Sequence, residues 1–349
     1  MTLVLASRWA SPANRQREAL RAAHTQDADA LIDLLTFYLG RKARGRGVSP
    51  QTLRNYGVAV RDLLEFTGPP ASPRFSLQNL TADDLEAYVA HTKARLRLRG
   101  QPGQLALGSV GTYLYGVRAL YRALTWAGVV KENPALAVPA PRDPTPAHTR
   151  KRAVPRSHYR ALLAAPGEQP DPARAARDTA ILVLGATLGL RAQEIVRLEV
   201  RDVQLDLREL RVRHGKGGKE RRVPLPGAAA GALARWLGVR RGMELADELS
   251  PAQTALIVSF HRGYLGRPLT TAGLRVIVNR YLRQVGLPPD LGGVHTLRRT
   301  AGTRLYRATR DLHVVADVLG HASVTTSAIY AKLDVDVRLE ALEAADQAD

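Results

Sequence analysis

The stretch Leu319-Gly320-His321-Ala322-Ser323-Val324-Thr325-Thr326-Ser327-Ala328-Ile329-Tyr330 organises the interpretation of the whole chain. A Leu-Gly pair is typical of a helix end, because glycine readily takes the left-handed conformation there. His321 follows this helix end, and Tyr330 stands nine positions later. Just upstream, His295 and Arg298 are three positions apart, which places both on one face of a helix. Both side chains can therefore face one ligand.

Two motifs farther upstream supply cations. Residues 189–194 read Gly-Leu-Arg-Ala-Gln-Glu and contribute Arg191, and residues 215–219 read Gly-Lys-Gly-Gly-Lys and hold Lys216 in a glycine turn. Guanidiniums can clamp phosphate oxygens bidentately, and nearby cations favour the phenolate form of a tyrosine. The pattern therefore predicts a site that binds an anionic phosphate and attacks it with a phenol, built from Arg191, Lys216, His295, Arg298, His321 and Tyr330.

Composition sets the class of partner. The chain has 349 residues, enough for two domains, and 45% of them are hydrophobic, so a sizeable core can be buried. Lys and Arg number 51 against 32 Asp and Glu, which gives a net charge of +19 and a pI near 10.8. This excess indicates a polyanion, first of all nucleic acid. A compositional bias of the genome would explain the use of arginine in place of lysine, but it would not explain the excess of positive over negative charges.

Several classes of protein are excluded. The sequence has no cysteine, so disulfides, thiolate nucleophiles and cysteine-based zinc sites are absent. No apolar run reaches the roughly 18 residues needed to cross a bilayer, and the longest, 179–190, is expected to be a buried helix. Residues 1–10 lack the basic start and the cleavage site of a signal peptide. We expect a cytoplasmic, nucleoid-associated protein without a membrane partner.

The first part of the chain is expected to be helical. Residues 1–26 are rich in Arg and Ala and form either a helix or a loose basic arm. Apolar residues at helical spacing, with helix starts at Ser49, Thr81 and Ser109, predict a domain of about four helices over 27–133. A basic loop within it is equally consistent with a solvated linker and with phosphate contacts. The candidate DNA contacts of this domain are Arg41, Lys42, Arg44, Arg46 and Arg54.

A proline-rich basic linker is predicted over 134–153. Such a segment is extended and semi-rigid. It is either a plain spacer or, because it joins two DNA-binding halves, a further contact to phosphates through Arg150, Lys151 and Arg152.

The second domain is expected over 154–333, mainly as helices with a small antiparallel β-sheet. Three short strands are predicted at 203–205, 209–213 and 221–225, with a glycine turn between the last two. A fourth strand is possible at 256–260. Helices are predicted at 156–165, 173–189, 194–198, 228–237, 270–282, 295–306, 312–319, 324–330 and 335–345.

Taken in order, these motifs resemble the tyrosine recombinase, or phage integrase, family. Ser-Pro-x-Thr-Leu-x-x-Tyr at 49–56 resembles the family's core-binding domain. Gly-Leu-Arg-x-x-Glu at 189–194, Gly-Lys-Gly-x-Lys-x-Arg-x-Val-Pro at 215–224, His-x-Leu-Arg at 295–298 and the 319–330 stretch resemble its catalytic domain. The resemblance is to the simple Xer-like members, because we expect no separate arm-binding domain. It implies a helical core-binding domain followed by an α+β catalytic domain.

The resemblance also implies a role for each polar residue. Arg191 and Arg298 would clamp the non-bridging phosphate oxygens, His321 would hydrogen-bond the phosphate, and Glu194 would orient the clamp. Any one of these residues alone is equally consistent with a helix cap, a turn or a core contact. Their joint occurrence in this order favours a site.

The chemistry implied is transesterification. Tyr330 would form a 3′-phosphotyrosyl link, His295 would accept or relay its proton, and Lys216 would protonate the departing 5′-oxygen. Because the ester stores the energy of the broken bond, neither ATP, nor a metal, nor another cofactor is implied.

Other basic residues are more ambiguous. Lys219, Arg221 and Arg222 predict either phosphate contacts or a solvated strand. Arg299, a further candidate DNA contact, stands where many relatives carry His, and Ser327 stands where Thr is common. Neither difference touches the proposed chemical groups.

The implied partner is double-stranded DNA. The active species would be a homotetramer on paired sites, formed from a protein that is monomeric or weakly oligomeric when free, with a second recombinase or an accessory protein as a further possible partner. Residues 334–349 combine acidic side chains with an incomplete apolar stripe. They are expected to dock on a neighbouring protomer or, alternatively, to pack on their own domain.

Three functions compete: an active site-specific recombinase, a non-catalytic DNA-binding protein on the same fold, and a type IB topoisomerase-like nicking-closing enzyme. The full set of reactive residues argues against the second, because binding alone needs no nucleophile. The two-domain layout argues against the third. The biological role stays open between resolution of chromosome or plasmid dimers and integration of a mobile element.

Overall fold

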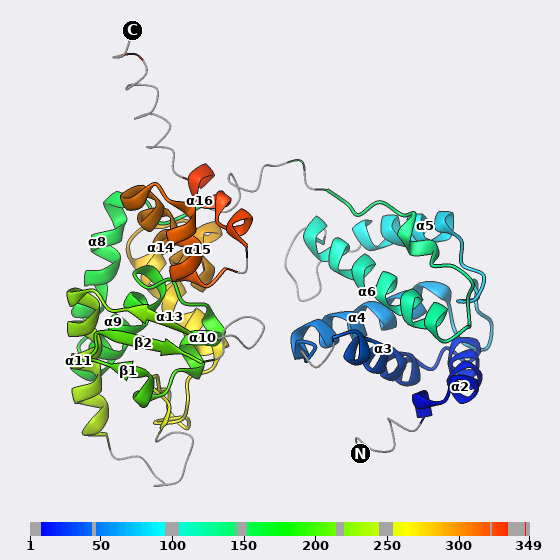
Figure 1. The fold of residues 1–349 in the computed structure, drawn as a ribbon, viewed down its shortest axis with the longest axis horizontal. Helices are drawn as coiled ribbons and strands as arrows, with labels where there is room; N and C mark the ends of the chain where they lie inside the picture. Colours follow the sequence, from blue (N-terminus) through cyan, green and yellow to red (C-terminus); the bar gives the residue numbers. More distant parts are fainter. Residues whose placement is uncertain are drawn as a thin grey trace. The chain divides into compact units, whose positions relative to one another are not determined.

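The structure is a computed structural model, and it describes residues 8–43, 47–94, 105–142, 144, 152–213, 220–243, 254–321, 323–333 and 346. The chain divides into two compact units, Met1–Pro144 and Thr145–Asp349, and each has a hydrophobic core of its own (Figure 1). The border between them falls inside the segment 134–153, for which the sequence predicts a linker.

The described part of the N-terminal unit is helical. Its elements are α2 (Pro12–His24), α3 (Ala28–Lys42), α4 (Pro50–Thr67), α5 (Ala82–Ala94), α6 (Leu107–Trp126) and the short 3-10 helix η1 (Pro134–Leu136). The carboxylate of Asp27 begins α3 by accepting a hydrogen bond from the backbone of Ala30, at 3.0 Å. Helix α6 begins two residues before the predicted start at Ser109. The N–H of Ser109 donates to the carbonyl of Ala106, so this serine lies inside the first turn.

The core of this unit forms where α4 and α6 pack together. They approach most tightly at Gly116, where a Cβ atom would stand 2.5 Å from the Cβ of Ala59. Helix α2 belongs to the same core through Ala19 and Ala22, and Trp9 just before the helix is also fully buried. Of the two alternatives for residues 1–26, the structure therefore has a helix over Pro12–His24, packed as part of the unit.

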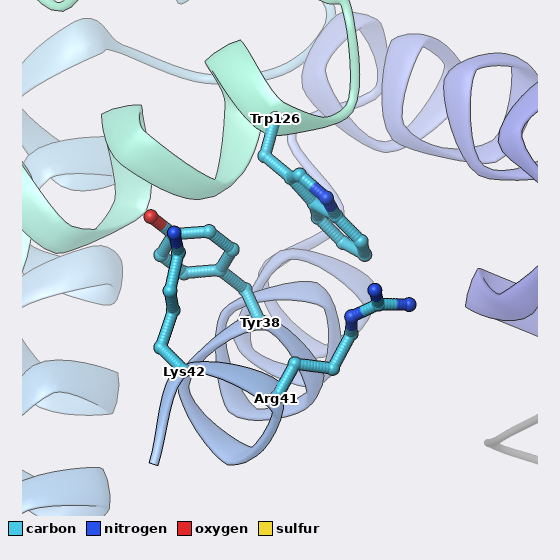
Figure 2. A pocket seen from close by; sticks show the side chains of 4 residues that line it. All are labelled: Tyr38, Arg41, Lys42 and Trp126. Atoms are coloured by element: carbon cyan, nitrogen blue, oxygen red, sulfur yellow. The ribbon is translucent and has the colours of Figure 1, made fainter. Parts of the chain in front are cut away.

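The C-terminal ends of α3 and α6 meet at a surface hollow of about 270 Å³ (Figure 2). Trp126 comes from α6, and Tyr38, Arg41 and Lys42 come from α3. The Tyr38 and Trp126 rings lie 5.6 Å apart. Two aromatic rings and two cationic side chains, from the ends of two helices, therefore line this hollow.

The second unit is mainly helical with one small sheet. Its α-helices are α8 (Arg156–Ala164), α9 (Pro172–Ala186), α10 (Ala192–Arg197), α11 (Gly227–Arg241), α13 (Thr271–Gln284), α14 (Val294–Thr309), α15 (Leu312–Leu319) and α16 (Ala328–Leu333). Short 3-10 helices are η2 (Ala165–Glu168), η3 (Val200–Asp202), η4 (Pro289–Leu291) and η5 (Val324–Thr326). None of the described helices in either unit is both long enough and apolar enough to span a bilayer.

The sheet has the three predicted strands, β1 (Val203–Gln204), β2 (Glu209–Val212) and β3 (Arg221–Pro224), which pair antiparallel in that order. In β2, Leu210 is buried and pairs with Val203 on one side and Val223 on the other. The fourth strand expected at 256–260 is wrong: within the described residues this segment makes only an isolated bridge, Val258 to Pro268. The predicted fold class, mainly α with a small antiparallel sheet, is confirmed.

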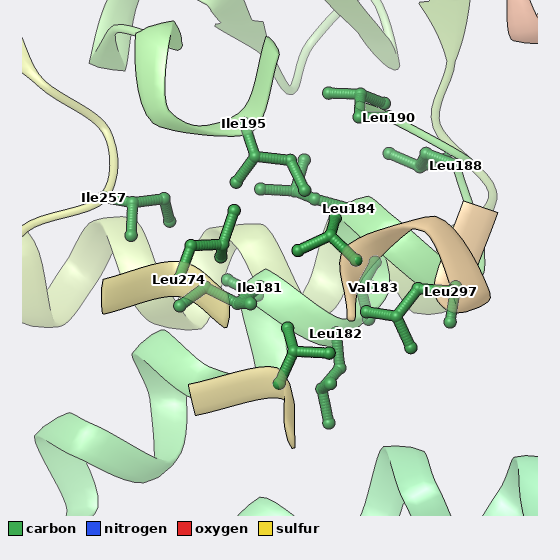
Figure 3. Packing of buried hydrophobic residues seen from close by; sticks show 14 of the residues in the cluster. Ile181, Leu182, Val183, Leu184, Leu188, Leu190, Ile195, Ile257, Leu274 and Leu297 are labelled. Carbon is green, nitrogen blue, oxygen red and sulfur yellow. The ribbon is translucent and has the colours of Figure 1, made fainter. Parts of the chain in front are cut away.

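Helix α9 runs through the middle of the second core (Figure 3). Every residue from Ala180 to Ala186 is buried, so the helix is covered on all sides. A Cβ atom at Gly185 would stand 2.7 Å from Leu297 Cδ1, so α14 packs directly on α9 here. Because Arg298 follows Leu297 and Arg191 follows the end of α9, this contact sets the spacing of the two arginines.

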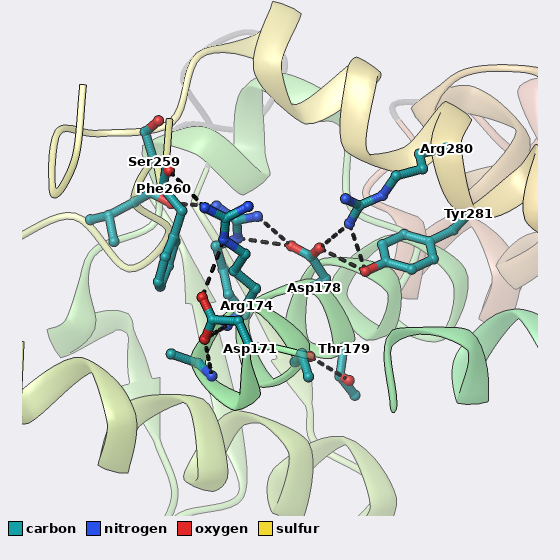
Figure 4. A network of polar contacts seen from close by, with 12 residues as sticks. Asp171, Arg174, Asp178, Thr179, Ser259, Phe260, Arg280 and Tyr281 are labelled. Carbon is teal, nitrogen blue, oxygen red and sulfur yellow. Dashed lines mark hydrogen bonds and ion pairs between the residues drawn. The ribbon is translucent and has the colours of Figure 1, made fainter. Parts of the chain in front are cut away.

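A buried carboxylate joins α9 to α13 (Figure 4). Asp178 has no exposed surface and accepts hydrogen bonds from Arg177 Nε at 2.8 Å, Arg280 Nη2 at 2.7 Å and Tyr281 Oη at 2.7 Å. Arg177 also donates to the carbonyl of Val258, at 3.2 Å. These hydrogen bonds and ion pairs offset the cost of burying the charge, and they connect α9 to α13.

Candidate active site

Arg298 lies at the centre of the site, on the buried face of α14. Its Nη1 donates to the carbonyl of Gly189 at 2.6 Å, and its Nη2 donates to the carbonyl of Leu319 at 2.8 Å. Burial, and next the charge of Arg191, lower the pKa of Arg298 to about 10. The guanidinium therefore stays charged at neutral pH and bridges the loop after α9 and the end of α15.

Arg191 reaches the same place from the start of α10. Its Nη1 donates to Glu194 at 2.8 Å, and its Nη2 donates to the carbonyl of Gly320 at 3.3 Å. The two arginines thus hold the consecutive carbonyls of residues 319 and 320. The structure brings together the pair for which the sequence predicts a clamp.

Two glycines make this approach possible. Gly189 has φ +70°, and a Cβ atom there would collide with Leu319 Cδ2. Gly320 has φ +65° and ends α15 in the left-handed conformation. A side chain at either position would separate the loops that carry Arg191 and His321.

Glu194 is buried among three arginines. One oxygen accepts from the backbone N–H of Arg191 at 2.8 Å, and Arg298 Nη1 lies 4.0 Å away. Burial alone would raise the pKa of Glu194, but hydrogen bonds from Arg221 and the backbone of Arg191, with the charges of both guanidiniums, lower it to about 2. The carboxylate is therefore ionised at neutral pH, and it binds the arginines in its deprotonated form.

Tyr330 is buried beside this cluster, at 4% exposure, on α16. Its ring stacks on His321 with centroids 5.9 Å apart and planes at 7°, and it packs on Gly302, where a Cβ atom would stand 2.6 Å from the ring. His321 Nδ1 is hydrogen-bonded to Ser327 Oγ at 2.7 Å. The histidine, the serine and the tyrosine of the 319–330 stretch therefore form one packed group.

The protonation of Tyr330 differs from the sequence-based expectation that nearby cations favour its phenolate. Burial raises the pKa of Tyr330, and it outweighs the opposing effects of the Arg298 charge, a hydrogen bond from Arg298, and the charges of Arg191 and Arg299. The phenol is therefore protonated at neutral pH, and the nucleophilic role predicted from the sequence would require a base.

Arg221 also differs from its prediction as a DNA contact or a residue of a solvated strand. Its side chain is 14% exposed, and both terminal nitrogens bind Glu194, at 2.9 and 3.0 Å. The sequence places Arg221 five residues after Lys216 but gives no sign of this long-range pair. Sequence reasoning lists Arg221 among the DNA contacts and does not anticipate its pair with Glu194. It also expects Ser327 not to touch the reactive groups, which is wrong, because Ser327 Oγ is hydrogen-bonded to His321 Nδ1 at 2.7 Å.

Comparison with known proteins follows this geometry. The sequence profile described as "Phage integrase family" matches residues 153–336, more than half of the chain. The chain belongs to the phage integrase family. The resemblance to Xer-like tyrosine recombinases is confirmed.

Relatives of this chain match both units. Two proteins named tyrosine recombinase XerC, from Roseiflexus castenholzii and Shewanella amazonensis, are 30% and 32% identical over 297 and 309 residues. The alignments cover 85% and 88% of this chain, and 88% and 93% of the relatives. A solved structure of XerH recombinase in a post-cleavage complex with its difH substrate matches with a TM-score of 0.67 at 21% identity, over 90% of this chain and 84% of that one. This structural match supports the fold.

The remaining predicted residues of the integrase site fall into two groups. His295 is exposed on α14, one turn before Arg298. Lys216 lies outside the described residues, between β2 and β3 in the sequence. The predicted DNA contacts Arg44, Arg46, Arg150, Lys151 and Lys219 also lie outside them.

The described DNA-contact candidates are exposed or half-buried. Arg222 is exposed on β3 and pairs with Glu209 at 3.4 Å. Arg152 is exposed and pairs with Asp290, and its carbonyl accepts from Arg299 Nη1 at 3.1 Å. Arg299 therefore fixes the end of the linker segment onto α14. Arg54 is exposed on α4 and donates to Gln51 at 3.1 Å.

Arg41 and Lys42 belong to the hollow at Trp126 (Figure 2). The guanidiniums of Arg15 and Arg41 lie 3.8 and 5.4 Å from the Trp126 ring centroid. Burial, and next the charge of Arg41, lower the pKa of Arg15. Two like charges on one indole make this place favourable for an anion.

Proposed function

We propose that this chain is a site-specific tyrosine recombinase that breaks and rejoins DNA strands through a 3′-phosphotyrosyl intermediate. One observation supports it above all: Arg191 and Arg298 hold consecutive carbonyls of the loop that carries His321, and the phenol of Tyr330 packs beside them. Guanidiniums so placed suit the non-bridging oxygens of a phosphodiester.

In the proposed reaction, Tyr330 Oη attacks the phosphorus of one DNA strand. A bond forms between this oxygen and phosphorus, and the bond from phosphorus to the 5′-oxygen breaks. His295 takes the phenolic proton, and Lys216 gives a proton to the 5′-oxygen that leaves. Attack by a 5′-hydroxyl of a second duplex reverses both steps and completes strand exchange. The number of ester bonds is unchanged.

The charged groups have separate proposed tasks. Arg191 and Arg298 stabilise the negative charge that the five-coordinate phosphorus places on its oxygens. His321 hydrogen-bonds the same phosphate, with its ring held by Ser327. Glu194 holds Arg191 in place and leaves the cluster with a net positive charge that favours DNA.

Outside this site, we propose that cations of both units contact phosphates. In the first unit these are Arg41, Lys42 and Arg54, with Arg44 and Arg46. In the second they are Arg152 and Arg222, with Arg150, Lys151 and Lys219. The linker would tether the two halves on one duplex.

The proposed working assembly is a homotetramer on two paired sites, acting on DNA at the nucleoid, because exchange joins four DNA arms. The acidic segment 334–349 is the proposed connector, since its charge complements the basic surface of a neighbouring protomer. The family resemblance keeps open a second recombinase or an accessory protein, and a role in dimer resolution or in element integration.

The test is a suicide substrate, nicked near the cleavage point, analysed on a denaturing gel. The wild-type chain should form a covalent protein–DNA adduct, and Tyr330→Phe should bind DNA but form none. Tyr306→Phe is the matched control, because Tyr306 is half-buried against the same small cluster and should keep the adduct. An adduct that persists in Tyr330→Phe would contradict the assignment. Strand exchange between two duplexes separates a recombinase from a nicking-closing enzyme.

A further inference from the structure

Arg221 is the residue that joins the sheet to the arginine clamp. It is the first residue of β3 and pairs with Val212, the last residue of β2. Lys216 lies between these two strands in the sequence. Its Nη1 and Nη2 reach different oxygens of Glu194, which is the fork geometry of a bidentate pair. The Glu194 side chain is only 2% exposed, so this ion pair is shielded from bulk water.

The Glu194 carboxylate also binds Arg191. Glu194 accepts from the backbone and from Nη1 of Arg191, each at 2.8 Å. Without Arg221, the carboxylate would lose two of its hydrogen bonds inside the protein, and would be free to turn toward Arg298, which lies 4.0 Å away. Either movement would displace the Arg191 guanidinium.

The other side of Arg221 contacts the loop before His321. A Cβ atom at Gly320 would stand 2.8 Å from Arg221 Cδ and 3.0 Å from both Nε and Nη1, so the guanidinium packs flat on this glycine. The carbonyl of Gly320 is also the acceptor for Arg191 Nη2. Arg221 is therefore packed between Glu194 and Gly320 and sets the distance between them.

We propose that Arg221 is a positioning residue: it holds Glu194 and Gly320 in place, and through them the phosphate-facing groups of Arg191 and His321, without contacting DNA itself. This inference rests on the proposed recombinase function. It replaces the phosphate contact that the sequence suggests for Arg221.

The experiment compares Arg221→Gln with Arg211→Gln. Arg211 lies on the neighbouring strand β2 and forms an exposed ion pair with Glu220, so it gives the same change of charge without a buried partner. DNA binding is measured by gel shift, and the first-order cleavage rate is measured on the suicide substrate at saturating protein. We expect Arg221→Gln to keep its DNA affinity and to cleave about 100-fold more slowly, as for a misplaced reactive group. Arg211→Gln should cleave at the wild-type rate.

A double-mutant cycle tests the route through Glu194. Once Glu194→Gln has removed the carboxylate charge, adding Arg221→Gln should slow cleavage little further. Arg221→Lys keeps the charge but not the fork, so its rate should fall between those of the wild type and Arg221→Gln. If Arg221→Gln does not fold, Arg221→Lys replaces it in the binding and cleavage measurements.

Two results would overturn the inference. One is a loss of DNA affinity in Arg221→Gln with normal cleavage at saturation, which would make Arg221 a DNA contact. The other is full additivity of the two substitutions in the cleavage rate. If the wild-type chain forms no adduct, the proposed recombinase function is contradicted, and cleavage can no longer test Arg221. The double-mutant cycle is then measured by thermal unfolding. Additive changes in Tm would overturn the link between Arg221 and Glu194, and non-additive changes would support it.

Discussion

At the scale of single residues, the site is a balance between one buried carboxylate and three guanidiniums. Glu194 neutralises one charge of the group formed with Arg191, Arg221 and Arg298 and leaves an excess that suits a phosphodiester. Breaking a buried pair by removing one partner is costly, because the other charge remains in a poorly solvated place. Each member of the group should therefore affect stability as well as catalysis.

The low pKa of Glu194 predicts a pH dependence of stability. Its pKa in the folded protein, about 2, lies below the ordinary value of 4.5, so its contribution is present above pH 4.5 and is lost as the pH falls toward 2. Glu194→Gln should lower the free energy of unfolding at pH 7 by about 3 kcal/mol. The difference from the wild type should shrink at pH 3, measured by urea unfolding. Glu209→Gln, which loses only the exposed pair with Arg222, is the control with a small effect at both pH values. Equal destabilisation by Glu194→Gln at both pH values would contradict this account.

At the scale of elements, local signals predicted most of the structure. Helix α15 has the predicted bounds, and α13 begins one residue after its predicted start at 270, because caps, glycine stops and apolar spacing act over a few residues. The three strands also follow from local pattern. Local signals fail where contacts between residues distant in sequence determine the structure. Residues 256–260 make an isolated bridge but no strand. Helix α2 packs into a hydrophobic core although its sequence is rich in Arg and Ala.

The residues of the site likewise divide into those that local sequence pattern predicts and those whose contacts only the fold reveals. Sequence pattern selected Arg191, Glu194, Arg298, His321 and Tyr330, and the structure brings them together. It could not reveal the partner of Arg221, because that contact spans 27 residues of sequence and depends on the packing of β3 beside α10. Nor could it give the balance between burial and charge at Tyr330, since burial is a property of the folded chain.

The ends of α3 and α6 predict an optical signal of DNA binding. Trp9 and Trp236 are fully buried, whereas Trp126 is half-buried beside Arg41 and Lys42. DNA bound in this hollow should change tryptophan fluorescence, and Trp126→Phe should remove the change.

The same hollow should contribute to the salt dependence of binding. The double variant Arg41→Gln, Lys42→Gln should reduce the slope of log affinity against log salt by about 2, because two phosphate contacts are lost. Arg61→Gln is the control, since Arg61 is exposed but pairs with Asp29 at 2.7 Å. An unchanged slope in the double variant would exclude the hollow as a contact.

At the scale of the whole molecule, the chain is two units with separate cores and a net charge of +19. A fragment of residues 154–349 keeps the second core intact. It should bind DNA about 100-fold more weakly than the full chain, because the tether no longer supplies the first unit at high effective concentration. A gel shift at fixed salt measures this ratio, and circular dichroism of the fragment confirms that it is folded. Equal affinities would contradict binding by both units.

The burial of Tyr330 makes the free protein a latent enzyme. A phenol that is 4% exposed is shielded from solvent and from passing phosphodiesters, so recognition of DNA and release of the nucleophile must be coupled. A tyrosine-nitrating reagent should first modify Tyr115 and Tyr264, which are 50% and 57% exposed, and should reach Tyr330 only when DNA is present. Peptide mapping before and after addition of DNA would measure this, and early nitration of Tyr330 in the free protein would contradict latency. Under the proposed mechanism, such an enzyme would not cut DNA before it has bound a site.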